Sequence, residues 1–115
     1  MNNDQPFLDK DALDELKLVM EDDFQMLVTT FLSDGKDRLI EIERTVASGV
    51  ADDIRRSAHS LKGSSSNIGA VRLSSACYVL EQAGANEDLT GSSDLLANIK
   101  AVFSETEDKL KSEYL

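Results

Sequence analysis

The 115-residue sequence contains one cysteine, one histidine, one proline and no tryptophan. Cys77 has no second cysteine to pair with, so a disulfide within the chain is excluded and we expect a cytoplasmic protein. Its apolar neighbours at helical spacing predict a core residue without a reactive role. No apolar run approaches the roughly 18 residues that span a bilayer, and the polar N-terminus lacks the features of a signal peptide. The sequence therefore predicts a soluble protein.

Basic residues are also scarce, since 12 Lys and Arg stand against 22 Asp and Glu and give a formal net charge of −10. A surface of this charge repels phosphate backbones and anionic lipid head groups, so we expect no nucleic acid and no membrane as partners. The length suits one core and is too short for two, which predicts a single domain over residues 1–115, ordered from about 8 to 114.

Apolar residues recur at helical spacing in five segments, and no segment shows the sustained alternation of a strand. We expect helices over residues 9–20, 22–48, 52–68, 70–83 and 92–114. Short connections between long amphipathic helices make neighbours antiparallel. The predicted fold is all-α: an antiparallel up-down four-helix bundle with an additional short N-terminal helix at one end. Its apolar stripes are used up within one bundle, which favours a monomer.

Several residues are predicted to begin or end these helices. Asp9 and Ser92 are expected N-caps, and Asp22 has Gln25 at the spacing of a capping box. Gly69 suits a left-handed C-cap after the third helix. Residues 84–91 are predicted to form a polar connection before the last helix.

The histidine, His59, lies in the third predicted helix beside its buried stripe. That stripe consists of Ile54, Ala58, Leu61, Ser65 and Ile68. The next row round the helix faces outward, so His59 is expected to be exposed, with Arg55 one turn before it and Lys62 nearly one turn after it. Gly63 follows on the same side and offers no side chain, and Ser66 continues this low surface.

An exposed imidazole flanked by cations has the chemistry of a phosphate carrier. Imidazole has a reference pKa of about 6.5, so a large share is neutral and nucleophilic at pH 7, and histidine serves as a covalent nucleophile. Neighbouring cations stabilise a phosphoryl group once it is attached. The sequence alone leaves plainer explanations open: Arg55 and Lys62 also fit solvated charges, Arg55 paired with Asp52, and Gly63 also fits a close helix contact.

The residues from His59 to Ser65, with Ile68-Gly69-Ala70 after them, resemble the signature of histidine-containing phosphotransfer (HPt) domains of multistep phosphorelays. The resemblance covers almost the whole chain and extends to the break before the histidine helix and to Leu80-Glu81 on the next helix.

The resemblance implies roles for His59 and for several of its neighbours. By it, His59 is phosphorylated on Nε2, Lys62 holds the phosphoryl group and Gly63 makes room for the partner domain. Some family members orient the imidazole through Nδ1 with a glutamine on the following helix, and Glu81 stands at that position here. Arg55 and Ser66 are expected to support the site.

By the same resemblance, the protein accepts a phosphoryl group from a receiver-domain aspartate of a hybrid sensor kinase and passes it to the aspartate of a response regulator. It is expected to be a phosphocarrier that does not use ATP and is not a classical enzyme, and the sequence has no Gly-rich phosphate loop. No cofactor or metal is expected, and any Mg²⁺ would come from the receiver. Two alternatives remain: a module that docks on a receiver without carrying phosphate, and a phosphohydrolase with a phosphohistidine intermediate.

Overall fold

In the computed structural model, which describes residues 5–115, the protein consists of helices and their connections. The helices are α1 (Lys10–Met20), α2 (Asp23–Ser48), α3 (Ala51–Ile68), α4 (Val71–Ala85) and α5 (Ser92–Tyr114). No strand occurs within these residues, which confirms the predicted all-α class. None of the helices in this range is both long and apolar enough to cross a membrane. The predicted domain start and the N-terminal segment without signal-peptide features fall partly on residues 1–4, outside the described residues.

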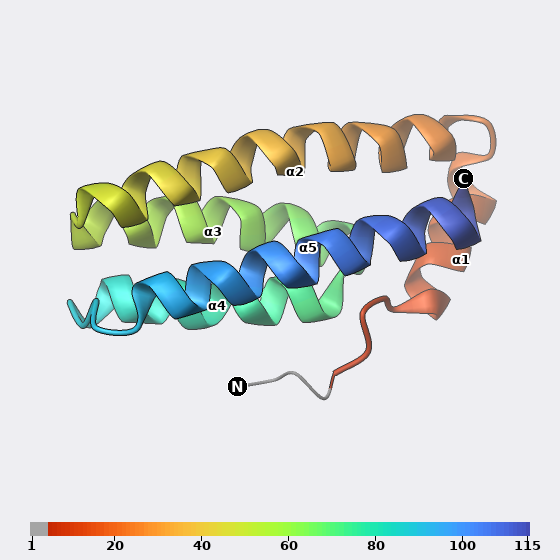
Figure 1. The fold of residues 1–115 in the computed structure, drawn as a ribbon. Coiled ribbons are helices and arrows are strands. Elements are labelled where there is room, and N and C mark those ends of the chain that lie inside the picture. Colours follow the sequence, from red (N-terminus) through yellow and green to blue (C-terminus); the bar gives the residue numbers. More distant parts are fainter. Residues whose placement is uncertain (1–4) are drawn as a thin grey trace.

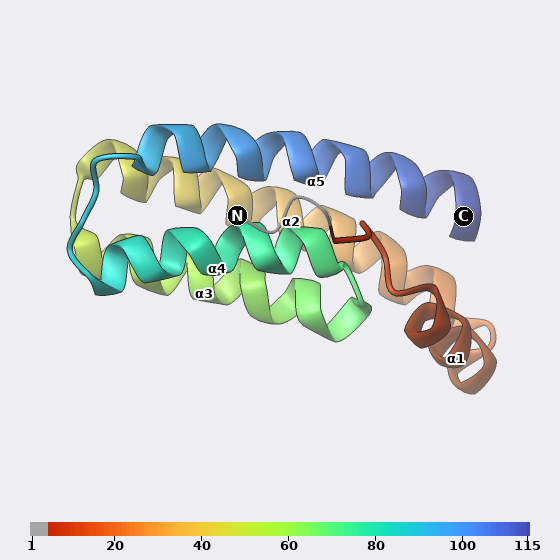
Figure 2. The same cartoon turned by 90° about the horizontal axis from the view of Figure 1, so that it is seen from below.

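Four of the helices lie side by side in two layers, α2 with α5 and α3 with α4 (Figures 1 and 2). α2 packs against α3 and α5, and α4 packs against the same two helices, so the four close a ring around one core. The chain reverses direction at each connection between them (Figure 1). α1 crosses one end of the ring. There the Asp9 N–H donates to the Gly69 carbonyl at 2.8 Å, and Lys10 pairs with Glu113 at 2.7 Å.

The predicted helix ends are confirmed at two positions and wrong at two others. The side chain of Asp9 caps α1, and Gly69 ends α3 in the left-handed conformation with φ 83°. Asp22 already has helical backbone angles (φ −66°), and its carboxylate accepts no hydrogen bond from the free N–H groups of the first turn, so the capping box does not form. Ser92 is the first residue of α5 and not its cap, because a turn that bonds its N–H to the Leu89 carbonyl starts the helix one residue early.

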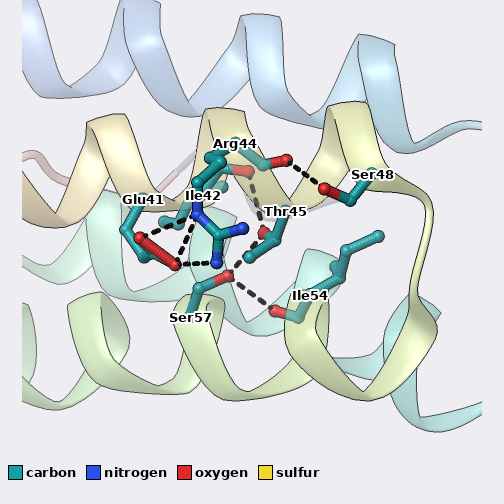
Figure 3. A network of polar contacts seen from close by, with 7 residues as sticks. All are labelled: Glu41, Ile42, Arg44, Thr45, Ser48, Ile54 and Ser57. Atoms are coloured by element: carbon teal, nitrogen blue, oxygen red, sulfur yellow. Dashed lines mark hydrogen bonds and ion pairs between the residues drawn. The ribbon is translucent and has the colours of Figure 1, made fainter.

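The core contains the whole predicted stripe of α3, since Ile54, Ala58, Leu61, Ser65 and Ile68 are all buried. It also contains a pair of hydroxyl groups that the sequence does not reveal. The hydroxyl oxygens of Thr45 on α2 and Ser57 on α3 lie 2.9 Å apart, and each also lies within hydrogen-bond distance of a carbonyl of its own helix (Figure 3). One hydroxyl donates to the other, which donates its own proton to its helix carbonyl. Because both hydroxyls have partners, their burial costs little, and the bond fixes α2 against α3 at one level.

α4 is longer than predicted, because it continues through Gly84 to Ala85. Gly84 was assigned to the polar connection, but it is buried where α4 touches the start of α3. A Cβ at this position would lie 2.7 Å from the Ala51 carbonyl oxygen and 2.8 Å from the Arg55 nitrogen. Only glycine allows this approach without a shift of one backbone. The contact brings Glu81, nearly one turn earlier on α4, level with His59 on α3.

Candidate functional site

His59 projects from the outer side of α3, and its side chain is 62% exposed. Its Nδ1 lies 2.9 Å from Oε2 of Glu81 on α4, and this carboxylate is only 12% exposed. Since an ionised carboxylate only accepts hydrogen bonds, the geometry assigns the ring proton to Nδ1. Nε2 then carries the lone pair of the ring, and it has no hydrogen-bond partner within residues 5–115. The structure thus pairs His59 with Glu81 in the geometry that the resemblance suggested.

Lys62 contacts the same carboxylate from the other side. Its Nζ lies 2.7 Å from Oε1 of Glu81 and 5.4 Å from the centre of the Tyr78 ring. This ion pair engages Oε1, which is buried. Opposite charge and the face of the ring hold the ammonium beside Glu81.

Burial and charge act in opposite directions on Glu81. Burial raises the pKa of this carboxyl, but the hydrogen bonds and positive charge of Lys62 and His59 together outweigh it, and the pKa lies below its usual value. Glu81 is therefore ionised at neutral pH, as the assignment of the proton to Nδ1 requires.

Gly63 lies in open space next to this site. A Cβ built on it would meet no atom within 4 Å. The interpretation of Gly63 as a close helix contact is therefore wrong, and no contact within residues 5–115 accounts for a residue that weakens the helix. The glycine leaves a bare stretch of backbone beside the imidazole.

The remaining predicted residues lie nearby without bonding to the imidazole in the described part of the chain. Arg55 pairs with Asp52 at 2.9 Å, which is the plain explanation that the sequence left open. Ser66 shares a hydrogen bond of 2.6 Å with Ser74 and joins α3 to α4. The basic cluster expected from the sequence is thus neutralised, since Arg55 and Lys62 each have an acidic partner.

Two features of the surroundings were not singled out from the sequence. Tyr78 precedes Glu81 by three residues on α4 and so shares its face, a spacing that could have marked it as a neighbour of the site. Arg38 on α2 bonds to Asp34 at 2.6 Å and to the hydroxyl of Ser60, the residue after His59. It fixes the side of the histidine helix that faces α2.

Cys77 is buried in the core, one turn before Glu81. Burial raises the pKa of its thiol to about 12, with a smaller contribution from the charge of Glu81. The thiol is therefore protonated and unreactive at neutral pH, in agreement with its predicted core role. Within residues 5–115, no group of three His, Cys, Asp or Glu side chains is placed to hold a metal ion.

The fold and the site define a class of protein: an all-α domain that presents one outward histidine held by a buried carboxylate. The chain belongs to the Hpt domain family, whose pattern it matches over residues 26–109. It is therefore a phosphorelay intermediate of two-component signalling, a phosphocarrier that interacts with receiver domains.

Solved structures agree with this assignment. The chain is similar to histidine-containing phosphotransfer protein B (HptB) from Pseudomonas aeruginosa PAO1, with 35% identity, 94% of each chain covered and a TM-score of 0.90. It is also similar to MtHPt2 from Medicago truncatula, with 26% identity, 95% of this chain and 78% of that chain covered, and a TM-score of 0.82. ZmHP2 from maize shares the fold at 21% identity, with 92% of this chain and 87% of that chain covered and a TM-score of 0.80. A search of curated protein sequences found no match.

Proposed function

We propose that His59 is the residue that carries the phosphoryl group, taken from a receiver aspartate of a hybrid sensor kinase and passed to the receiver aspartate of a response regulator. One observation carries this proposal: Glu81 holds Nδ1 at 2.9 Å and leaves Nε2 available beside a glycine where an added Cβ would meet no atom of residues 5–115 within 4 Å. A reactive nitrogen next to bare backbone suits a nucleophile that another protein must approach.

In the forward step, Nε2 attacks the phosphorus of the aspartyl phosphate. The Nε2–P bond forms, the P–O bond to the aspartate breaks, and the aspartate leaves as a carboxylate. The ring gains positive charge as the bond forms, and the ionised Glu81 stabilises it through Nδ1–H. Transfer to the second receiver reverses these events, so no proton has to leave the ring in either direction.

Lys62 and Gly63 have separate parts in this proposal. Lys62 turns from Glu81 toward the oxygens of the attached phosphoryl group, because a second anion then lies within its reach. Gly63 lets the receiver backbone come close to the imidazole. Arg55 and Ser66 support the site from a distance, the first as part of a charged pair and the second by joining α3 to α4.

Other properties belong to the same proposal. We interpret the architecture as an antiparallel up-down four-helix bundle with an additional short N-terminal helix, an interpretation supported by the closed ring of α2 to α5. The domain works in the cytoplasm without ATP or a resident cofactor, and the receiver supplies the Mg²⁺ needed for transfer.

The direct test is incubation of the protein with a phosphorylated receiver domain and a search for acid-labile, alkali-stable phosphate on it. His59→Gln is the matched control, since the sequence offers no other histidine to carry such a signal. Labelling that survives this substitution would overturn the proposal. Binding without labelling would favour the docking module, and steady release of free phosphate would favour the phosphohydrolase.

The role of Glu81 can be tested separately. A hydrogen bond to a charged group contributes about 1.5–3 kcal/mol, and each 1.4 kcal/mol is tenfold in rate, so Glu81→Ala should slow transfer about 10- to 100-fold. Glu81→Gln keeps an acceptor for Nδ1–H and should therefore slow transfer less than Glu81→Ala does. Equal rates for the two variants in single-turnover transfer would contradict a positioning role through this hydrogen bond.

A further inference from the structure

The layer opposite the histidine carries a groove between α2 and α5. It has a volume of about 460 Å³, and its floor and walls are largely apolar. Ile40 lies on its α2 side and is 65% exposed. α2 and α5 form one layer of the domain, and α3 and α4, which hold His59 and Glu81, form the other (Figure 2). The groove therefore takes no part in the site described above.

Both walls of the groove carry the same sequence pattern: a lysine, an apolar residue three positions later and a glutamate seven positions later. On α2 the pattern consists of Lys36, Leu39 and Glu43. On α5 it consists of Lys100, Phe103 and Glu107.

Because α2 and α5 run in opposite directions, the two patterns pair end to end across the groove. Lys36 forms an ion pair with Glu107 at 2.9 Å, and Lys100 forms one with Glu43. The residues that line the groove thus have a local two-fold axis through their apolar centre, with one lysine and one glutamate at each end. This set of residues is electrically balanced in a protein whose net charge is −10. Lys111, outside the groove, also pairs with Glu107 at 3.2 Å.

A face of this kind is complementary to itself. Two copies can meet face to face about a two-fold axis that runs along the helices or across them. In either arrangement each lysine of one copy lies over a glutamate of the other, and Ile40 lies at the apolar centre of the contact. Apolar burial at the centre and opposite charges at the rim are the usual construction of a protein interface.

From this symmetry we propose that the α2/α5 face binds a second copy of the chain and forms a weak two-fold dimer. The molecule is 43 Å long, and two adjacent helices about 10 Å wide each offer enough area for the ~800 Å² per partner of an ordinary interface. The apolar centre is small, so the dimer dissociates on dilution. This revises the expectation of a monomer, which assumed that every apolar stripe is used within one bundle.

The dimer would leave both histidines accessible. α3 and α4 lie in the layer away from the contact (Figure 2), so the helix that carries His59 lies outside the interface in both copies. Dimerisation then permits phosphotransfer and places two carriers in one particle.

Sedimentation equilibrium from about 10 µM to 1 mM tests the proposal with the full chain. The wild-type protein should shift from monomer to dimer with increasing concentration. Ile40→Asp places two like charges at the centre of the contact and should weaken the dimer at least tenfold. Lys36→Glu combined with Lys100→Glu makes all four charged residues that line the groove acidic and should abolish the dimer, with thermal unfolding used to show that each variant is folded.

The matched control is Leu18→Asp, which alters another exposed apolar side chain, 79% exposed on α1. It should leave the association unchanged. A wild-type protein that stays monomeric to 1 mM would overturn the proposal. So would a dimer that tolerates Ile40→Asp, or one that Leu18→Asp weakens equally. Labelling of His59 by a phosphorylated receiver should be normal in Ile40→Asp, which separates this proposal from that of the phosphorylated residue.

Discussion

Replacement of Gly63 by alanine should stabilise the domain and impair its function. Gly63 lies inside α3, where glycine is about 0.5–1 kcal/mol less favourable than alanine, and the new Cβ would meet nothing within 4 Å. Gly63→Ala should therefore raise the free energy of unfolding by about that amount. For a domain of this size the gain corresponds to a rise of about 2 to 6 °C in the midpoint of thermal unfolding.

The same substitution should slow transfer from a phosphorylated receiver, because the added methyl group occupies the bare backbone beside His59. Gly63→Glu should block transfer while the helix stays folded. Both variants need thermal unfolding by circular dichroism together with a single-turnover transfer assay. Normal transfer by Gly63→Glu would refute the close-approach argument, and a lower midpoint for Gly63→Ala would show that the glycine has an internal structural role.

Gly84 provides the contrast within the same pair of helices. Its Cβ would press on the backbone of α3 at 2.7 Å, and backbone cannot move aside as the end of a side chain can. Gly84→Ala should lower the midpoint of unfolding even though it also removes a glycine from a helix. If Gly63→Ala raises the midpoint of unfolding and Gly84→Ala lowers it, then Gly84 is needed for packing between helices and Gly63 is not.

Three further predictions concern stability and reactivity. Asp9→Ala removes the cap of α1 and should cost about 0.5–2 kcal/mol in denaturant unfolding, whereas an unchanged free energy would mean that α1 is held by other contacts alone. The Cys77 thiol, buried and with its pKa raised to about 12, should react with a thiol reagent at pH 8 only as fast as the domain opens; rapid labelling of the folded protein would contradict this. The hydrogen bond from Lys36 lowers the pKa of Glu107 against the opposing effect of burial, and Lys111 also lowers it. The ionised Glu107 therefore contributes its full stabilisation of the fold above the ordinary pKa of 4.5, and this contribution is lost as the pH falls through the lower folded value. Glu107→Gln should reduce the free energy of unfolding at pH 7 by up to about 1 kcal/mol and weaken the acid dependence below pH 4.5, measured at low protein concentration; an unchanged acid profile would count against these ion pairs.

The sequence was sufficient for the features that depend on the periodicity of one helix. The buried stripe of α3 follows from its apolar spacing, and that stripe places His59 outward before any other helix is known. The position of Glu81 followed from the resemblance, and its distance to the imidazole required the structure. Asp9 and Gly69 were recognisable as caps because their partners lie within a few residues.

Features that depend on contacts between helices were missed. Gly84 looked like a loop residue, since only the backbone of α3 shows why glycine is needed there. Thr45 and Ser57 looked like polar positions, and only their mutual hydrogen bond permits burial. Lys62 was expected beside the histidine, but its acidic partner could not be named from the sequence, because Glu81 lies on another helix.

α3 and α4 contact each other closely at two positions along their length. At one level Gly84 rests against the first turn of α3, and at the other the hydroxyls of Ser66 and Ser74 are bonded at 2.6 Å. The hydrogen bond between His59 and Glu81 lies between these two contacts along the helices. Relative sliding of the two helices is then suppressed where it would change the distance from the ring to the carboxylate. A receiver that pushes on α3 moves the nucleophile and its counter-charge as one rigid piece, so the strength of docking and the alignment of the imidazole can change independently of each other.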